Sequence, residues 1–261
     1  MPAYRPGVSN RLLPLLAIVC LPLMAVPAGA QLSPDWQLCI KTQSETDAGI
    51  AACTRIIRSG KERGRNLAIA YNNRGDGYWA KNTTEDDDKA LADYSQAIRI
   101  DPRYAVAYIN RGLIWYRKNN IDSAIDDYTK SIEINSKDPM AFNNRGNAYK
   151  KKGELDNALA DYDDAIKLDK QPVAIRFANR GNVWLDKGDY ERAIADFDEA
   201  IKIDPDFPAA FTGRGLAYEK KGDIERAKVD FTESLKLPPR YDSAKWAHDK
   251  AKERLDALSK S

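Results

Sequence analysis

A single unit recurs five times along most of this chain, and it constrains the fold more than any other feature. Each copy contains a glycine directly preceded by an arginine, and consecutive glycines are separated by 37, 34, 35 and 34 residues. A fixed period near 34 residues indicates a repeat array rather than a globular domain with one core. The five glycines are Gly75, Gly112, Gly146, Gly181 and Gly215.

Within each copy, apolar and small residues recur three and four positions apart, which is typical of two amphipathic helices. In the second copy, Tyr108, Gly112 and Trp115 mark the first helix, and Ala124 and Tyr128 mark the second. One such hairpin cannot bury its own apolar face, so neighbouring hairpins must stack to form a core. The pattern therefore predicts an all-α solenoid.

The order of these residues resembles the tetratricopeptide repeat (TPR), in which a large apolar residue, Gly, aromatic, Ala, aromatic, Ala and Pro follow one another over 34 positions. The resemblance covers residues 68–241 in five copies, although Ser136 and Lys170 stand where the closing proline belongs. It implies a superhelix whose concave groove is lined by the first helix of each copy and commonly binds extended peptides.

Shorter segments flank the five copies. Residues 31–67 are interpreted as a degenerate helical hairpin, in which Cys53 replaces the packing aromatic residue. Residues 242–261 are interpreted as a capping helix with one polar face, as a repeat stack requires. The stretch from Trp36 to Gly75 is similar to exported repeat proteins of alphaproteobacteria, which favours the periplasm.

The first 30 residues have the three-part layout of a secretory signal peptide. Arg5 and Arg11 precede an apolar run from Leu12 to Val26, and small residues precede a predicted cleavage between Ala30 and Gln31. The run is too short for the roughly 20 residues that span a bilayer, and an uncleaved anchor is the alternative. We therefore expect a periplasmic or secreted protein with no stable membrane insertion after cleavage.

Three cysteines all lie in the first fifth of the chain. Cleavage would remove Cys20 and leave Cys39 and Cys53, which are expected to pair in an oxidising compartment. A pair of free, buried thiols is the alternative. A disulfide would staple the degenerate hairpin and compensate for its weak apolar content.

The charge balance argues against a nucleic-acid partner. Lys and Arg total 41 against 39 Asp and Glu, and the signs alternate along the chain instead of forming a basic stripe. His248 is the single histidine, and no phosphate-binding loop, metal-ligand spacing or nucleophile–histidine set appears. The sequence thus predicts a protein without cofactor, metal or catalytic activity.

An asparagine stands two residues before the repeat glycine in four copies. A step of two residues turns a helix by about 200°, so these side chains should point away from the packed face. In the resembled family this face lines the groove, where such an asparagine commonly bonds the main chain of a peptide. The alternative is that they cap local backbone groups or are solvated. They are Asn73, Asn110, Asn144 and Asn179.

Other residues are expected to face the same groove. Trp79 and Tyr116 suggest an apolar pocket near the first copies, and Lys150 with Arg117 and Lys151 suggests a basic patch farther along. Such a patch could hold a carboxylate or an acidic segment, whereas ordinary solvated helix surface is the alternative.

Each copy also carries one arginine and one aspartate beside buried positions. We interpret them as a repeated link between the two helices, and ligand binding is the alternative. The pairs are Arg74 with Asp93, Arg111 with Asp127, Arg145 with Asp161, Arg180 with Asp196, and Arg214 with Asp230.

These observations predict a non-catalytic protein-interaction module of the cell envelope that binds extended peptide segments in its concave groove. Two other functions stay open. The chain could be an architectural subunit that docks an envelope complex through its convex face or helix ends, or it could be the regulatory subunit of an enzyme.

Overall fold

The computed structural model describes residues 32–239 and 242–260, which form thirteen α-helices and no strand. The predicted signal peptide, its cleavage site and Cys20 lie outside the described residues. The all-α fold class expected from the sequence is confirmed for the described chain. The helices fall into two compact units, one ending at Lys152 and the other beginning at Gly153, and each is described by itself.

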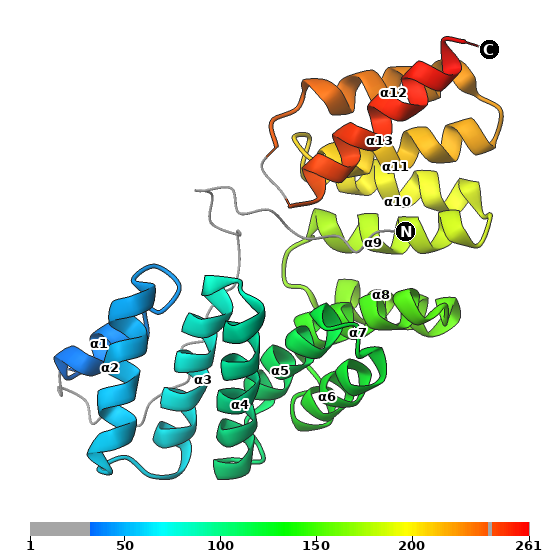
Figure 1. Ribbon diagram of the computed structural model, residues 1–261. Helices are drawn as coiled ribbons and strands as arrows, with labels where there is room; N and C mark the ends of the chain where they lie inside the picture. The colour runs from blue at the N-terminus through cyan, green and yellow to red at the C-terminus, as the bar shows by residue number, and fades with distance from the viewer. Residues whose placement is uncertain (1–31, 240–241, 261) are drawn as a thin grey trace. The chain divides into compact units, whose positions relative to one another are not determined.

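The first unit consists of successive antiparallel hairpins (Figure 1). We call the first helix of each hairpin its A helix and the second its B helix. The A and B helices alternate in the order α1 (Pro34–Cys39), α2 (Thr46–Ser59), α3 (Gly64–Lys81), α4 (Thr84–Ile100), α5 (Ala105–Arg117), α6 (Ile121–Ile134) and α7 (Pro139–Lys152).

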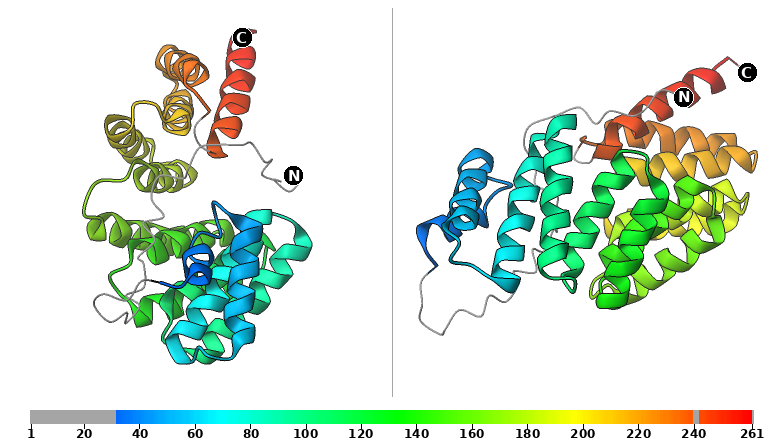
Figure 2. Two further views of the ribbon diagram at one scale, coloured as in Figure 1. Left: turned by 90° about the vertical axis from the view of Figure 1, so that its left-hand side faces the viewer. Right: turned by 60° about the horizontal axis from the view of Figure 1, so that its bottom comes forward.

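The second unit begins with a B helix and ends with a single additional helix (Figures 1 and 2). Its helices are α8 (Leu155–Leu168), α9 (Ala174–Asp186), α10 (Tyr190–Ile203), α11 (Pro208–Lys220), α12 (Ile224–Lys236) and α13 (Asp242–Leu258). None of the described helices is long and apolar enough to cross a membrane.

The repeat glycine lets the two helices of a hairpin approach each other. A Cβ atom on Gly112 would lie 2.6 Å from the ring of Tyr128, and one on Gly215 would lie 2.7 Å from the ring of Phe231. Both rings are buried in the core. Any larger residue would push the B helix away, and therefore the glycine recurs in each copy.

The turn between the A and B helices needs a left-handed residue. Gly153, Gly188 and Gly222 have φ angles of 86°, 78° and 83°, and Asn82 and Asn119 take the same place in the first two copies with φ of 55° and 63°. Glycine and, next, asparagine adopt this conformation at low cost, so the turn follows directly from the sequence.

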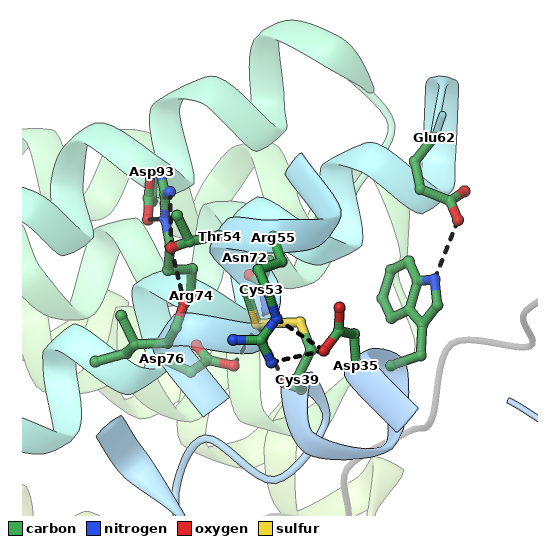
Figure 3. The surroundings of a disulfide bond; sticks show 12 residues. Asp35, Cys39, Cys53, Thr54, Arg55, Glu62, Asn72, Arg74, Asp76 and Asp93 are labelled. Carbon is green, nitrogen blue, oxygen red and sulfur yellow. Dashed lines mark hydrogen bonds and ion pairs between the residues drawn. A yellow bond between two sulfur atoms is a disulfide. The ribbon is translucent and has the colours of Figure 1, made fainter. Parts of the chain in front are cut away.

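A disulfide joins Cys39 of α1 to Cys53 of α2, with a Cα–Cα distance of 4.8 Å (Figure 3). Both cysteines are fully buried and lie in one apolar cluster with Trp36. The indole of Trp36 donates to Glu62 at 3.1 Å. The bond therefore holds a helix of six residues, which would be too short to persist alone, against α2.

The last helix, α13, packs on α11 and α12 in the way a further A helix would. Ala244, Ala247 and Ala251 are fully buried. The hydroxyl of Thr212 donates to the carbonyl of Ala247 at 3.1 Å, and Arg254 Nε donates to Glu219 at 2.9 Å. No described B helix follows α13, and its opposite face is charged, with exposed residues such as Lys245, Asp249 and Lys252.

Candidate interaction surface

The predicted groove residues lie on the A helices, and we call the surface formed by their exposed positions the A-helix face. The structure uses some of these side chains to hold neighbouring A helices together and leaves others available. The two groups differ in their hydrogen bonds.

Asn110 of α5 is engaged inside the first unit. Its Nδ2 donates to Asn72 Oδ1 at 3.1 Å and to Asp76 Oδ1 at 3.0 Å, both on α3. The sequence-based expectation did not include these two bonds, and a role for Asn110 in binding a peptide stays a prediction. A polar cluster on α3, formed by Asn72 and Asp76, accepts both amide hydrogens of Asn110. Only the side-chain carbonyl oxygen of Asn110 is left for a ligand.

That cluster is centred on the carboxylate of Asp76. The hydroxyl of Tyr94 donates to Asp76 Oδ1 at 2.8 Å, and Asn72 Nδ2 donates to Asp76 Oδ2 at 3.2 Å. Three neutral donors thus surround one carboxylate, and burial raises the pKa of Asp76 to about 7. Asp76 could not be recognised from the repeat pattern, because it occupies a position that the other copies fill with Leu or Asn.

The other three asparagines are placed differently. Asn73 is half-buried and makes no hydrogen bond within the described chain. Asn144 accepts a long bond of 3.4 Å from Asn143, and its amide hydrogens have no partner among the described residues. Asn179 is also half-buried and has an interaction partner.

The aromatic residues of the A-helix face are stacked with cations from the next A helix. The guanidinium of Arg117 lies 3.6 Å from the ring centroid of Trp79, and Lys151 Nζ lies 4.6 Å from that of Tyr116. Arg117 also pairs with the buried carboxylate of Asp87. The predicted apolar pocket and basic patch are therefore parts of one series of cation–π contacts. Lys150, which is half-buried, has a partner as well.

The repeat arginines form links among three helices. Four of the five pair in a bidentate manner with the aspartate of their own B helix, as Arg111 does with Asp127 at 2.8 and 2.7 Å. Each also reaches the preceding B helix, as Arg111 does to Ser95 at 3.3 Å. The same bidentate pairing joins Arg74 to Asp93, Arg180 to Asp196, and Arg214 to Asp230.

These arginines are occupied in the stack, and the geometry favours the structural interpretation over ligand binding. Hydrogen bonds from Arg180 to Asp196 raise the pKa of the guanidinium, so it stays charged. Arg145 donates to Thr129 at 3.1 Å in the same way as Arg111 does to Ser95. Its pairing with Asp161 stays a prediction.

A second repeated link was missed at the sequence level. The lysine six residues after each repeat glycine pairs with an acid near the start of the preceding B helix. The pairs are Lys81–Asp47 (2.6 Å), Lys118–Asp88 (2.7 Å), Lys152–Asp122 (3.0 Å), Lys187–Asp156 (2.5 Å) and Lys221–Glu191 (2.8 Å). The constant offset from the glycine was the signal that could have revealed it.

The described residues hold no group of His, Cys, Asp and Glu side chains that could bind a metal ion. The buried acids seen with partners are paired with Arg or Lys, whereas the half-buried Asp76 is not. The surface offers side-chain amides, aromatic rings and one carboxylate, which are groups suited to binding a peptide.

Comparison with protein families gives matches over more than half of the chain. A family described as "TPR repeat" matches residues 84–119, 114–153 and 181–222, and two described as "Tetratricopeptide repeat" match residues 139–172 and 208–241. The first A helix of the five copies, α3, lies outside these matches. No curated protein matches the sequence.

Several solved structures are similar to this fold. MamA shares 26% identity with a TM-score of 0.56, over 62% of this chain and 92% of its own. YrrB, described as a TPR protein with an unusual peptide-binding site, shares 23% with a TM-score of 0.58, over 77% and 99%. PilW, described as a widely conserved type IV pilus biogenesis factor, shares 19% with a TM-score of 0.61, over 75% and 93%.

Proposed function

The chain belongs to the tetratricopeptide repeat family, whose members bind protein partners, and we propose that it is a non-catalytic scaffold that captures an extended segment of another protein on its A-helix face. The observation that carries this proposal is the presence of half-buried amides, Asn73 and Asn144, whose donors are not used in stacking. A side-chain amide both donates and accepts, so it matches a peptide main chain of any sequence.

The neighbouring aromatic rings support the same proposal. Trp79 and Tyr116 are half-buried and held rigid by the cations stacked on them, Arg117 and Lys151. A ring that is already fixed loses little side-chain entropy when it contacts a ligand. The amides would hold the main chain of a segment, and the rings would select its side chains.

We further propose that the protein acts in the cell envelope. Three observations support this location: the signal-peptide pattern of residues 1–30, the disulfide between Cys39 and Cys53, and a fold similar to PilW. A buried disulfide is typical of an oxidising compartment.

Affinity capture from envelope extract would test the proposal. The full chain serves as bait, and the partner is identified by mass spectrometry. The double variant Asn73→Ala/Asn144→Ala is expected to lose at least tenfold in captured partner with unchanged melting, whereas Lys130→Ala/Lys202→Ala on the exposed B-helix surface serves as the matched control. Equal capture by the first double variant and the wild type would overturn the proposal.

One observation favours the second candidate function, docking through the B-helix surface. Val229 of α12 is 66% exposed, and Leu235 of the same helix is 40% exposed. Exposed apolar side chains can take part in a contact with another protein. Loss of the captured partner in Val229→Asp, but not in the asparagine variant, would identify this surface instead.

A further inference from the structure

The carboxylate of Asp76 differs from those of the buried acids that pair with an arginine across helices. Asp93, Asp127, Asp196 and Asp230 each have an arginine, and Asp87 has Arg117. Asp76 receives only Tyr94, Asn72 and Asn110, all of them neutral donors. Since an acid removed from water is normally paired with a cation, this one is an exception that calls for an explanation.

The arginines nearest in sequence are already committed elsewhere. Arg74, two residues before Asp76, makes both of its carboxylate contacts with Asp93, at 2.7 Å each (Figure 3). Arg111, next to Asn110, is bound to Asp127 and Ser95. Neither arginine can therefore move to Asp76 without breaking a link of the stack.

Asp76 lies on the A-helix face. It is half-buried rather than fully buried. It lies one residue after the repeat glycine, three residues after the amide of Asn73 and three before the ring of Trp79. Residues three apart on a helix are neighbours on its surface, so the carboxylate stands between the proposed main-chain amide and the proposed ring.

We propose that Asp76 is the specificity-determining residue of the A-helix face and that it selects a segment carrying a lysine or arginine side chain. This inference rests on the proposed peptide-binding function and assigns the charge of the partner. A cation brought by the partner would supply the counter-charge that the fold withholds. The proposed preference for basic segments is the reverse of the acidic preference expected from Arg117 and Lys151. Both of those cations already lie against aromatic rings of the neighbouring A helix.

The protonation of Asp76 gives the proposal a second readout. Its pKa of about 7 means that most molecules carry the neutral acid at pH 6 and the carboxylate at pH 8. The titratable groups that feel its charge are Tyr94 of α4 and Tyr104 ahead of α5, whose hydroxyls stay protonated because burial raises both pKa values. Binding of a basic segment should therefore strengthen from pH 6 to pH 8.

The experiment uses the oxidised full chain and a peptide array as probe. Twelve-residue peptides of varied sequence are each presented in three forms that differ only by Arg, Gln or Glu at one position. At pH 8 the wild type is expected to bind the Arg form about tenfold more tightly than the Gln form and to reject the Glu form. At pH 6, one unit below the pKa, only about a tenth of the molecules carry the carboxylate, so the preference should fall to about twofold.

Two variants separate this role from a structural one. Asp76→Asn keeps the size of the side chain, and Asp76→Leu introduces the residue found at the corresponding positions Leu113 and Leu216. Both are expected to remove the preference for Arg and its pH dependence while the chain stays folded. Asp126→Asn, at an exposed acid of α6, is the matched control and should leave both unchanged.

The outcomes distinguish this inference from the proposed function. An unchanged preference for Arg in folded Asp76→Asn would overturn the assignment of Asp76. A preference for the Glu form would overturn the predicted charge of the partner. If the array bound no peptide, both this inference and peptide capture would fail, whereas loss of envelope capture in Asn73→Ala/Asn144→Ala alone would leave peptide capture standing.

Discussion

The two units build the same arginine link with different third partners. In the first unit the arginine reaches a hydroxyl on the preceding B helix, at 3.3 Å to Thr54, 3.3 Å to Ser95 and 3.1 Å to Thr129. In the second unit it reaches a carboxylate, at 2.6 Å to both Asp163 and Asp198. One cation balances one acid in the first unit and faces two acids in the second.

The units also differ where one hairpin stacks on the next. In the first, Asn110 fills the place two before the glycine and meets the carboxylate of Asp76. In the second, Gly213 fills that place, and a Cβ atom there would lie 2.4 Å from the ring of Phe197. At the same place in the repeat, neighbouring hairpins thus contact each other through polar groups in the first unit and through close apolar packing in the second.

Removing the arginine tests whether the third partner matters. Arg214→Ala is expected to cost about 4 kcal/mol of stability and Arg111→Ala about 3 kcal/mol, because each leaves a buried aspartate unpaired and the first also leaves Asp198 beside Asp230. Thermal unfolding followed by circular dichroism measures both, with Lys130→Ala as the control. Equal and small losses would contradict the assignment of these arginines to the stack.

The disulfide is present only in the first unit among the described residues. The double variant Cys39→Ser/Cys53→Ser is expected to lose about 3 kcal/mol, because the bond closes a loop with a sequence separation of 14. Hydrogen exchange should show faster opening of α1 and α2, and unchanged protection of α11 and α12. Uniform loss of protection along the whole chain would mean that the two units unfold as one.

The close packing of Gly213 is a property of the second unit. Gly213→Ala is expected to destabilise by about 2 kcal/mol, since the added methyl group would overlap the ring of Phe197. Val229→Ala, at an exposed position of α12, serves as the control for the same denaturant titration. If Gly213→Ala were as stable as the wild type, the apolar joint would be looser than described.

The Asp76 cluster gives the first unit a pH dependence. Its folded pKa of about 7 exceeds the ordinary value of 3.8. The group therefore favours the fold at acidic pH, and this contribution is lost as the pH rises from about 4 to 7. The melting temperature of Asp76→Leu minus that of the wild type should therefore be a few degrees larger at pH 8 than at pH 5. The same difference at both pH values would mean that Asp76 titrates normally.

The smallest effect is expected from exchanging the third partner itself. Asp198→Ser converts the link of the second unit into that of the first, and because Asp198 is half exposed the change in stability should stay below about 1 kcal/mol. Its clearer signature is a weaker dependence of the melting temperature on salt. Unaltered salt dependence would indicate that Asp198 does not contribute through its charge.

The fold could be predicted from the sequence because the residues that define it recur. The glycine, the alanine and the aromatic ring occupy the same places in every copy, so each confirms the others. The left-handed turns at Gly153, Gly188 and Gly222 follow from single residues in the same way. The packed face of α13 could be predicted because Ala244, Ala247 and Ala251 recur at helical spacing.

The interaction surface was harder to predict for a physical reason. A periodic pattern gives the direction of a side chain but not its partner, so Asn110 was placed on the correct helix without its bonds to Asn72 and Asp76. Asp76 departs from the repeat and therefore stood outside the pattern. The lysine links were overlooked because each joins two different hairpins, which a pattern within one copy does not reveal.

The lysine links carry a consequence for how such a chain can change in length. Each joins one hairpin to the next through the same offset and the same pair of charges, from Lys81 to Lys221. A duplicated hairpin inserted between two others would bring its own lysine and acid in register on both sides. Gene duplication could thus lengthen or shorten the array without redesigning its joints, except at the asparagine–aspartate contact between α3 and α5.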